Sequence, residues 1–277
     1  MTTLADLIRD RFGLPSGAGD DLPADGALAG ILRHRTHRRY ADKPVDERLI
    51  ELLLAAAFSA PSKSDLQQCS VIRVSDPARW QALAALLPDM PWVGLAPAFF
   101  VFCGDGRRIR RVSAMRGREF ANDHLDGFLN PAADAAMVLT TFMIAAESVG
   151  LGCCAISVLR NHAERVAEIV ELPEAVFPFA GCCLGWPAQA GYVSLRLPPA
   201  VTVHADRYED GRLEAEIDAY DRRRDQRFRI PQAQHKYVEE FGEPAFYGWS
   251  EDKARQTAKP ERAGFGDFLR RRGFTLR

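Results

Sequence analysis

The sequence predicts a sheet packed between helices, in an α/β or α+β fold. Two observations lead to this prediction. Short apolar segments rich in aromatic and β-branched residues alternate along the chain with longer segments of helical periodicity. Most of these short segments lack a polar face, which indicates strands covered on both sides. The chain has 277 residues, of which 47% are hydrophobic and 26% charged, so it can bury such a core.

The first elements are an N-terminal arm and a helix that leads into strands. Residues 1–27 hold a helical segment, LADLIRDRF, and a loop rich in Gly, Pro and Asp, which together we interpret as a surface arm. A helix is expected between Pro44 and Pro61, with Asp46 near its start. Strands are expected in CSVIRVSD and APAFFVFCGD, on either side of a helix in PARWQALAALL.

The second half of the sheet follows a very apolar helix at residues 131–150. This helix has almost no polar face, so we expect it to be buried on all sides. Strands are expected in CCAISV and FPFAGCCLGWP, separated by a helix with Asn161 as its N-cap. Residues 192–277 are charged and too poor in apolar positions for a core of their own. We interpret them as an extension of a single domain at 28–277, wrapped over it or over a partner subunit.

Charge, targeting signals and cysteines exclude several classes of protein. Lys and Arg number 36 against 37 Asp and Glu, which argues against a surface that coats nucleic acid or an anionic membrane. The N-terminus does not resemble a signal peptide, and no uninterrupted apolar run has the length of a membrane span, so a cytoplasmic protein is expected. The six cysteines lie in apolar surroundings without metal-ligand spacing, so we expect buried thiols, no metal site and no thiol-redox activity.

The segment HRTHRRY at residues 34–40 concentrates positive charge in a chain of net charge −1. Arg35 and Arg38 are three residues apart, so in a helical turn or tight loop they would share a face with the Thr36 hydroxyl. Two guanidinium groups and a hydroxyl suit a phosphate. Spacing alone equally fits a solvated basic patch paired with nearby acidic residues.

Two further stretches have the composition of ligand-binding loops. The loop SAPSKSDLQQ at 59–68 gathers hydroxyls and amides before a buried strand, where they could bind a polar planar ligand or form an ordinary loop. The GLG at 150–152 follows a buried helix, but the GxGxxG pattern of a dinucleotide-binding fold is absent. Neither stretch identifies a function alone.

Taken in order, these stretches resemble the FMN-dependent nitroreductase family, and in particular its oxygen-insensitive, NADPH-dependent nitroreductase and flavin reductase branch. The resemblance runs from about residue 28 to the C-terminus and rests on HRTHR, SAPSKSDLQ, AFFVFC, AAESVGLGCCAISVLRN and GCCLGWP. It implies an α+β fold with a mixed central sheet flanked by helices, and a homodimer embraced by the C-terminal extension.

The resemblance also implies an activity. Bound FMN would carry the chemistry, passing a hydride from NADPH or NADH to small electrophilic acceptors such as nitroarenes, quinones or free flavin, without catalytic side chains. Flavin reductases and more specific ene or dehalogenating reductases on the same fold are the alternatives. Outside this family, a thiol-redox protein or a nucleic-acid-binding protein would be the competing classes.

The resemblance assigns cofactor-binding roles residue by residue. The basic segment at residues 34–38 and one later arginine would hold the flavin phosphate and ribityl chain. Two other stretches would line the flavin ring. Arg262 would face the nicotinamide nucleotide. The residues concerned are His34, Arg35, Thr36, Arg38 and Arg196 for the phosphate and ribityl side, Ser62, Ser64 and Gln67 for the ring and chain, and Ala155, Ile156 and Ser157 for the ring edge.

Some positions depart from the family pattern. Ser194 stands where the branch has a lysine two residues before the second phosphate arginine, so one positive charge is missing there. Lys63 and Asp65 change the charge of the flavin loop, and Ala155 replaces a tyrosine near the ring. The basic run at 222–224 and Arg262 fit a solvated face as well as a nucleotide site.

Overall fold

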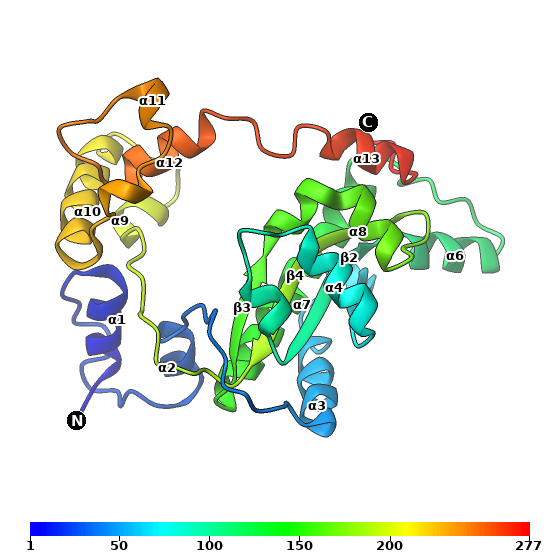
Figure 1. Ribbon diagram of the computed structural model, residues 1–277, viewed down its shortest axis with the longest axis horizontal. Coiled ribbons are helices and arrows are strands. Elements are labelled where there is room, and N and C mark those ends of the chain that lie inside the picture. The colour runs from blue at the N-terminus through cyan, green and yellow to red at the C-terminus, as the bar shows by residue number, and fades with distance from the viewer. The chain divides into compact units, whose positions relative to one another are not determined.

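A computed structural model describes residues 1–277 as two compact units (Figure 1). The larger unit comprises residues 35–191 and 262–277, and the smaller unit comprises residues 1–34 and 192–261. Each unit is described by itself. The predicted division into an arm and a single domain stays a prediction.

The larger unit is built on a four-stranded sheet in the order β1-β2-β4-β3. Every pair of neighbouring strands is antiparallel, so the expected α+β class is confirmed, whereas the expectation of a mixed sheet within this chain is wrong. The expected strands are present and the two central ones are almost entirely buried, because helices cover both of their faces. The strands are β1 (Cys69–Arg73), β2 (Ala98–Asp105), β3 (Gly152–Ile156) and β4 (Val176–Gly185).

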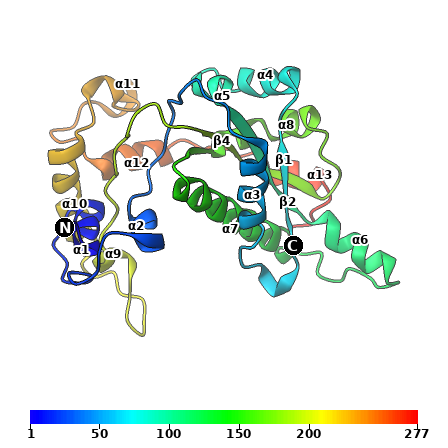
Figure 2. The same ribbon diagram turned by 90° about the horizontal axis from the view of Figure 1, so that it is seen from below.

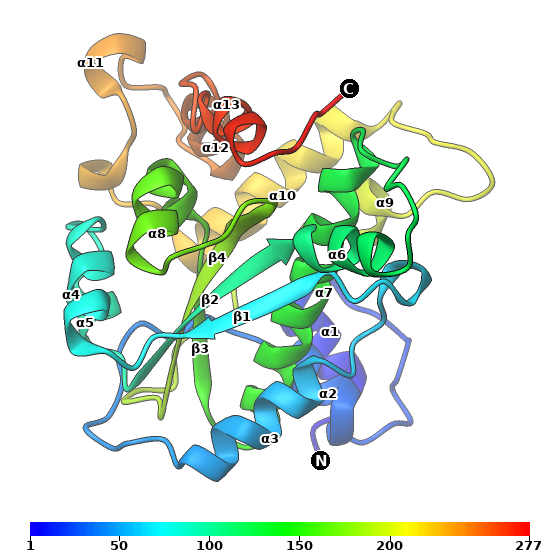
Figure 3. The same ribbon diagram turned by 90° about the vertical axis from the view of Figure 1, so that its right-hand side faces the viewer.

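Two helical layers cover the sheet (Figure 3). Helices α3 and α7 pack on one face, and α4, α5, α8 and α13 pack on the other. The adjacent cysteines point to opposite faces of the sheet, since Cys153 and Cys182 join one core cluster and Cys154 and Cys183 the other. The helices are α3 (Glu47–Ala57), α4 (Pro77–Ala85), α5 (Trp92–Leu95), α6 (Arg107–Met115), α7 (Asp126–Ser148), α8 (Ala163–Ile169) and α13 (Phe265–Arg271), with 3-10 turns at Lys63–Asp65 and Ser157–His162.

The predicted start of one helix is confirmed and the predicted cap of another is wrong. Helix α3 begins as predicted, because the Asp46 carboxylate accepts a hydrogen bond from the Arg48 N–H at 2.8 Å. The expectation that Asn161 caps α8 is wrong. Asn161 lies inside the preceding 3-10 turn, and its side-chain oxygen accepts a hydrogen bond from Arg262 instead.

The long helix α7 runs along the sheet beside α3 (Figure 2). It begins five residues earlier than predicted, and the expectation that it is buried on all sides is wrong. Leu129, Ala133, Thr140 and Ile144 are exposed, and their spacing places them along one side of the helix. By length and composition α7 could span a membrane, as core helices of soluble proteins also could, and here it packs on the sheet.

The smaller unit consists of short helices joined by loops. The predicted N-terminal helix is confirmed, with Thr3 and Asp6 forming a capping box. Leu4 and Leu7 pack against Ala29 in a small apolar cluster. The helices are α1 (Leu4–Phe12), α2 (Gly26–Leu32), α9 (Pro199–Thr202), α10 (Leu213–Phe228), α11 (Val238–Phe241) and α12 (Trp249–Thr257), with a 3-10 turn at Gln232–Gln234.

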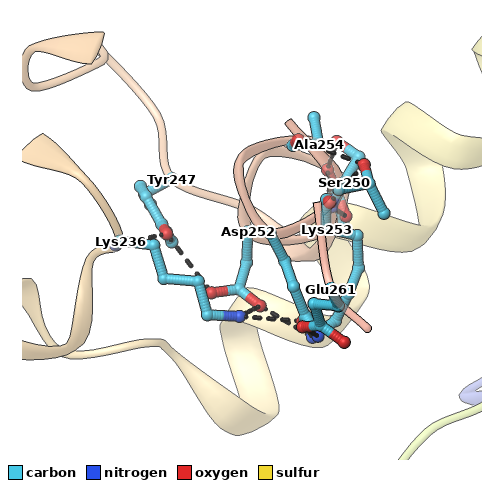
Figure 4. Close-up of polar contacts among 10 residues, drawn as sticks. Lys236, Tyr247, Ser250, Asp252, Lys253, Ala254 and Glu261 are labelled. Carbon is cyan, nitrogen blue, oxygen red and sulfur yellow. Dashed lines mark hydrogen bonds and ion pairs between the residues drawn. The ribbon is translucent and has the colours of Figure 1, made fainter. Parts of the chain in front are cut away.

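A polar network around Asp252 takes the place of a larger apolar core in this unit (Figure 4). Its carboxylate accepts a hydrogen bond from the Tyr247 hydroxyl at 3.2 Å and forms ion pairs with Lys236 at 2.9 Å and Lys253 at 2.8 Å. The two lysines lower the pKa of Asp252 against the opposing effect of burial. The network therefore joins α12 to the loop that carries α11.

Candidate functional site

Strand β3 leaves one backbone edge open, and this edge meets the basic segment that follows α2. The His37 N–H donates to the Cys153 carbonyl at 2.9 Å, so the backbone groups of Cys153 point away from β4. Backbone direction alternates along a strand, so the N–H of Ala155 also points outward from this edge. Ala155 is exposed, and its small side chain leaves that N–H accessible.

The basic segment itself is extended rather than helical or tightly turned. Arg35 and Arg38 therefore do not share a face in the way that helical spacing would allow. Arg35 donates to the Ala190 carbonyl at 3.1 Å. The intervening His37 is buried and fixes the segment, because its ring occupies the space beside Gly152 where any side chain would clash, with a Cβ only 2.7 Å from the ring.

Arg38 extends over the indole of Trp92, with its guanidinium carbon 5.6 Å from the ring centroid. The indole Nε1 of Trp92 is buried beside the Cys154 thiol. Burial raises the pKa of the neighbouring Cys154 thiol, and the positive charge of Arg38 acts in the opposite direction. The Arg38 guanidinium supplies a positive charge at this edge, which suits an anionic or electron-rich ligand.

A second group of predicted residues lies in the loop before β1, where a buried carboxylate organises it. Asp134 of α7 is 1% exposed and accepts hydrogen bonds from Ser62 Oγ at 2.8 Å, the Lys63 N–H at 3.0 Å and the Gln68 N–H at 2.7 Å. Because a buried carboxylate needs such donors, the loop and the helix stabilise each other.

This loop holds an unusual backbone. Ser64, Asp65 and Gln67 have φ values of 50°, 58° and 51°, in the left-handed region that non-glycine residues seldom adopt. Such strain is kept only where surrounding bonds impose it, and it clusters at functional sites. Ser62, Asp65 and Gln67 line a cavity of about 340 Å³ together with Cys69 and Asp134.

Arg262 lies near the end of β3. Its guanidinium donates to the Asn161 side chain at 3.1 Å, within the 3-10 turn that begins at Ser157. Burial lowers the pKa of Arg160, and the neighbouring Arg262 charge lowers it further. Ile156, the last residue of β3, is buried, whereas Ser157 is exposed. Arg262 therefore joins the β3 end of the candidate site.

The remaining two predicted residues belong to the smaller unit. Arg196 donates to the Ser194 hydroxyl at 2.7 Å, and its backbone N–H donates to the Arg11 carbonyl at 2.8 Å. The His34 carbonyl accepts from the Arg11 guanidinium at 2.5 Å. Both residues are thus ordered by the N-terminal helix.

Comparison with known proteins decides the family. The model of the nitroreductase family matches residues 31–186, and the model of its C-terminal domain matches residues 194–277. The chain belongs to the nitroreductase family. The first match spans the basic segment, the strained loop and β3, and the second spans Arg196 and Arg262. Together the two matches cover every predicted site residue.

Individual members of the nitroreductase family resemble this chain over most of its length. The oxygen-insensitive NADPH nitroreductase of Salmonella typhimurium is 33% identical over 246 residues, covering 88% of this chain and 96% of that protein. The FMN reductase [NAD(P)H] of Bacillus subtilis is 34% identical and covers 70% of this chain and 79% of that protein. The structure of the NADPH:FMN oxidoreductase from Vibrio harveyi complexed with NAD+ has a TM-score of 0.77 at 29% identity, covering 91% of this chain and all of that one.

Two residues that shape this nitroreductase site were missed from the sequence. Asp134 carried a signal, because it is a single acidic residue in the middle of an apolar helix. Trp92 carried no such signal, since a tryptophan in a short helix usually fills a core.

Within the larger unit the predicted residues fall into two groups. Arg35, Thr36 and Arg38 lie along the β3 edge with Ala155, Ile156, Ser157 and Arg262, and Ser62, Ser64 and Gln67 lie in the loop before β1.

Proposed function

We propose that this protein is an FMN-dependent NAD(P)H oxidoreductase that reduces small electrophilic acceptors such as nitroarenes, quinones or free flavin. The proposal is supported by relatives named as an NADPH nitroreductase, an FMN reductase and an NADPH:FMN oxidoreductase. The observation that carries it is the open edge of β3, where the His37 N–H of the basic segment binds the Cys153 carbonyl and the Ala155 N–H faces outward.

These residues fit a flavin in chemical terms. When bound, FMN supplies the hydride-accepting ring and passes the reducing equivalents on. The N–H groups of Ala155 to Ser157 would donate to the ring edge, and Ser62, Ser64 and Gln67 would line the ring and the ribityl chain. The phosphate would bind His34, Arg35, Thr36, Arg38 and Arg196, with Arg262 toward the nicotinamide nucleotide.

The protein would position the flavin and its substrates and stabilise developing charge, and no side chain would act as an acid or a base. The donors along the β3 edge are fixed by the sheet and by the buried His37, so no reorganisation is needed when negative charge develops beside them. The loop held by Asp134 would fix the flavin ring, against which the nicotinamide and then the acceptor would bind in turn. Binding both substrates in one place in succession gives a ping-pong scheme.

We further propose a homodimer in which each site combines residues of two subunits. The loop before β1 and the end of β3 lie at opposite edges of the sheet, separated by three strand spacings, or about 14 Å. Two copies related by a twofold axis could bring the loop of one subunit to the β3 edge of the other. The exposed apolar side of α7 supplies a surface that such a partner would cover.

We also propose a cytoplasmic location, because NADPH is supplied there.

Purified protein is expected to be yellow, to release FMN on denaturation, and to lose its visible flavin absorbance when NADPH is added without oxygen. Colourless protein that does not take up added FMN would contradict the flavoenzyme assignment.

Mixed dimers test the shared site. Arg38→Ala and Asp134→Ala each damage a different half of the site, so a dimer containing one copy of each variant has one intact site. Co-expression of the two is expected to restore flavin bleaching that neither variant shows alone. If the mixture is as inactive as its parents, each subunit carries its whole site by itself.

A further inference from the structure

Helix α6 follows strand β2 directly and is rich in arginine. Two of its arginines, Arg107 and Arg111, make no hydrogen bond or ion pair. Arg110 binds the C-terminal segment, since its guanidinium donates to the Gly273 carbonyl at 2.8 Å. Arg108 alone among them contacts the loop before β1, which the proposed function places beside the flavin.

The Arg108 guanidinium donates to two backbone carbonyls where that loop enters the strand. Nη1 donates to the Gln67 carbonyl, and both Nη atoms donate to the Cys69 carbonyl at 3.2 Å. Nη2 also donates to the Ser70 hydroxyl at 2.7 Å. Asp105 fixes the guanidinium in this place, because its carboxylate accepts from Nη2 and from the Arg108 N–H, each at 3.0 Å. The planar fork of an arginine suits several fixed acceptors at once.

The peptide group between Gln67 and Gln68 is therefore bound at both ends by charged side chains. Its carbonyl accepts from Arg108, and its N–H donates to the Asp134 carboxylate at 2.7 Å. Hydrogen bonds to ionised groups are about twice as strong as neutral ones. A rotation of this peptide group would break both bonds, so its orientation is fixed. We call this arrangement of Arg108 and Asp134 the peptide clamp.

The conformation of Gln67 follows from these bonds. Its own N–H donates to the Ser62 hydroxyl at 2.8 Å, so both peptide groups that flank its Cα are held. Its φ of 51° lies in the left-handed region, which a non-glycine residue keeps only where surrounding bonds impose it. Gln67 lines the cavity of about 340 Å³ described above. The peptide clamp therefore determines how this residue faces the cavity.

The competing explanation is that Arg108 only neutralises a buried acid. Asp105 is 8% exposed, and a buried carboxylate needs donors. The Ser70 hydroxyl at 2.6 Å and the Arg108 backbone N–H already supply two of them. The contacts of the guanidinium with the Gln67 and Cys69 carbonyls add nothing to the pairing of Asp105, which indicates that they serve the loop.

We propose that Arg108 is a positioning residue of the flavin site, which acts with Asp134 to clamp the peptide group beside Gln67. Gln67 would touch the cofactor, whereas Arg108 acts on it only through the backbone carbonyl. The proposal rests on the proposed function, because it assumes that Gln67 lines the flavin.

The experiment compares Arg108→Lys with Arg111→Lys, the same change at a bound and at an unbound arginine of α6. Lysine keeps the positive charge beside Asp105, but one ammonium group cannot span all the acceptors of the guanidinium. In flavin-free full-length protein, the segment 62–69 of Arg108→Lys is expected to exchange its amide hydrogens about tenfold faster than in wild type, as for one lost charge-assisted bond. The dissociation constant of FMN, measured by quenching of flavin fluorescence, is expected to rise about tenfold. Arg111→Lys should change neither quantity.

A double-mutant cycle distinguishes a clamp from two independent anchors. Asp134→Asn weakens the other end of the same peptide group and should raise the FMN dissociation constant by itself. Once one end is free, loss of the other matters less, so adding Arg108→Lys to Asp134→Asn should change the constant less than about twofold further. At saturating FMN, the visible spectrum of the flavin bound to Arg108→Lys should also differ from wild type, because Gln67 lies against the ring. A variant that is merely less stable keeps the wild-type spectrum.

The outcomes separate the two proposals. Unchanged exchange in Arg108→Lys, or faster exchange with unchanged FMN affinity, overturns the inference and leaves the flavoenzyme assignment in place. Exchange that is faster throughout the larger unit shows general damage and overturns it as well, as do effects of the two substitutions that multiply in full. Wild-type protein that binds no FMN refutes the proposed function, and with it the flavin contact of Gln67.

Discussion

Replacing Asp134 with asparagine tests how the loop before β1 is held. An amide has one acceptor oxygen, so it can keep at most two of the three hydrogen bonds from Ser62, Lys63 and Gln68. One charge-assisted bond worth about 1.5–3 kcal/mol is lost, and two others weaken by about 1 kcal/mol each. Together these changes lower the free energy of unfolding by roughly 3–5 kcal/mol.

Urea unfolding of the flavin-free protein measures this change. With a slope of about 3 kcal/mol per molar, the midpoint is expected to fall by about 1 M or more. Hydrogen exchange should show faster opening at the Lys63 and Gln68 amides than elsewhere in the larger unit, since they lose their acceptor. Asp126→Asn, at an exposed position of the same helix, is the control and should cost less than about 1 kcal/mol. Equal midpoints for the two variants would refute the role assigned to Asp134.

Three further predictions concern the flavin, the thiols and pH. Arg38→Ala should weaken FMN retention much more than Lys43→Ala, whose side chain lies over Trp186, and equal retention would assign the basic segment to a solvated face. Native protein should react with no thiol reagent at pH 8, because all six cysteines are buried and burial raises the pKa of Cys69 to about 12; rapid labelling would revive the thiol-redox alternative. The folded-state pKa of Asp252 is lowered, so its contribution to stability is present above its unfolded pKa near 3.8 and is lost as pH falls through the folded value. Acid unfolding of Asp252→Asn should show a smaller decrease over that range than wild type, and parallel curves would contradict this.

Much of the fold could be predicted from the chain, since its strands are short, apolar and bounded by turn residues. The exposed side of α7 could not, because apolar residues at exposed positions have the same composition as those in a core. The extended form of residues 35–40 was missed because the spacing of two charges shows that they share a face only when the backbone is known to be helical. The pairing of that segment with β3 depends on the buried His37 and the neighbouring Gly152.

The residues of the candidate site could be named from the sequence, but the contacts that hold them in place could not. Sequence motifs named the residues that resemble a flavin site, whereas the residues that hold them are distant in sequence. Asp134 contacts a loop about 70 positions earlier, and Arg11 contacts Ser194 across 183 positions. Such contacts leave no local pattern, so only the assembled structure reveals them.

The way Asp134 holds its loop also determines which positions of the loop tolerate substitution. The carboxylate accepts hydrogen bonds from the backbone at Lys63 and Gln68 and from the Ser62 hydroxyl, and no hydrogen bond joins it to the side chains at 63 to 65. The conformation of the loop is therefore set from the helix, and the side chain of Lys63 is not needed for it. Asp65 is more restricted, because its φ is 58° and its carboxylate accepts a hydrogen bond from the Gln67 side chain at 2.9 Å. A substitution at position 63 can thus change the charge that the loop presents without removing the bonds that hold the loop in place.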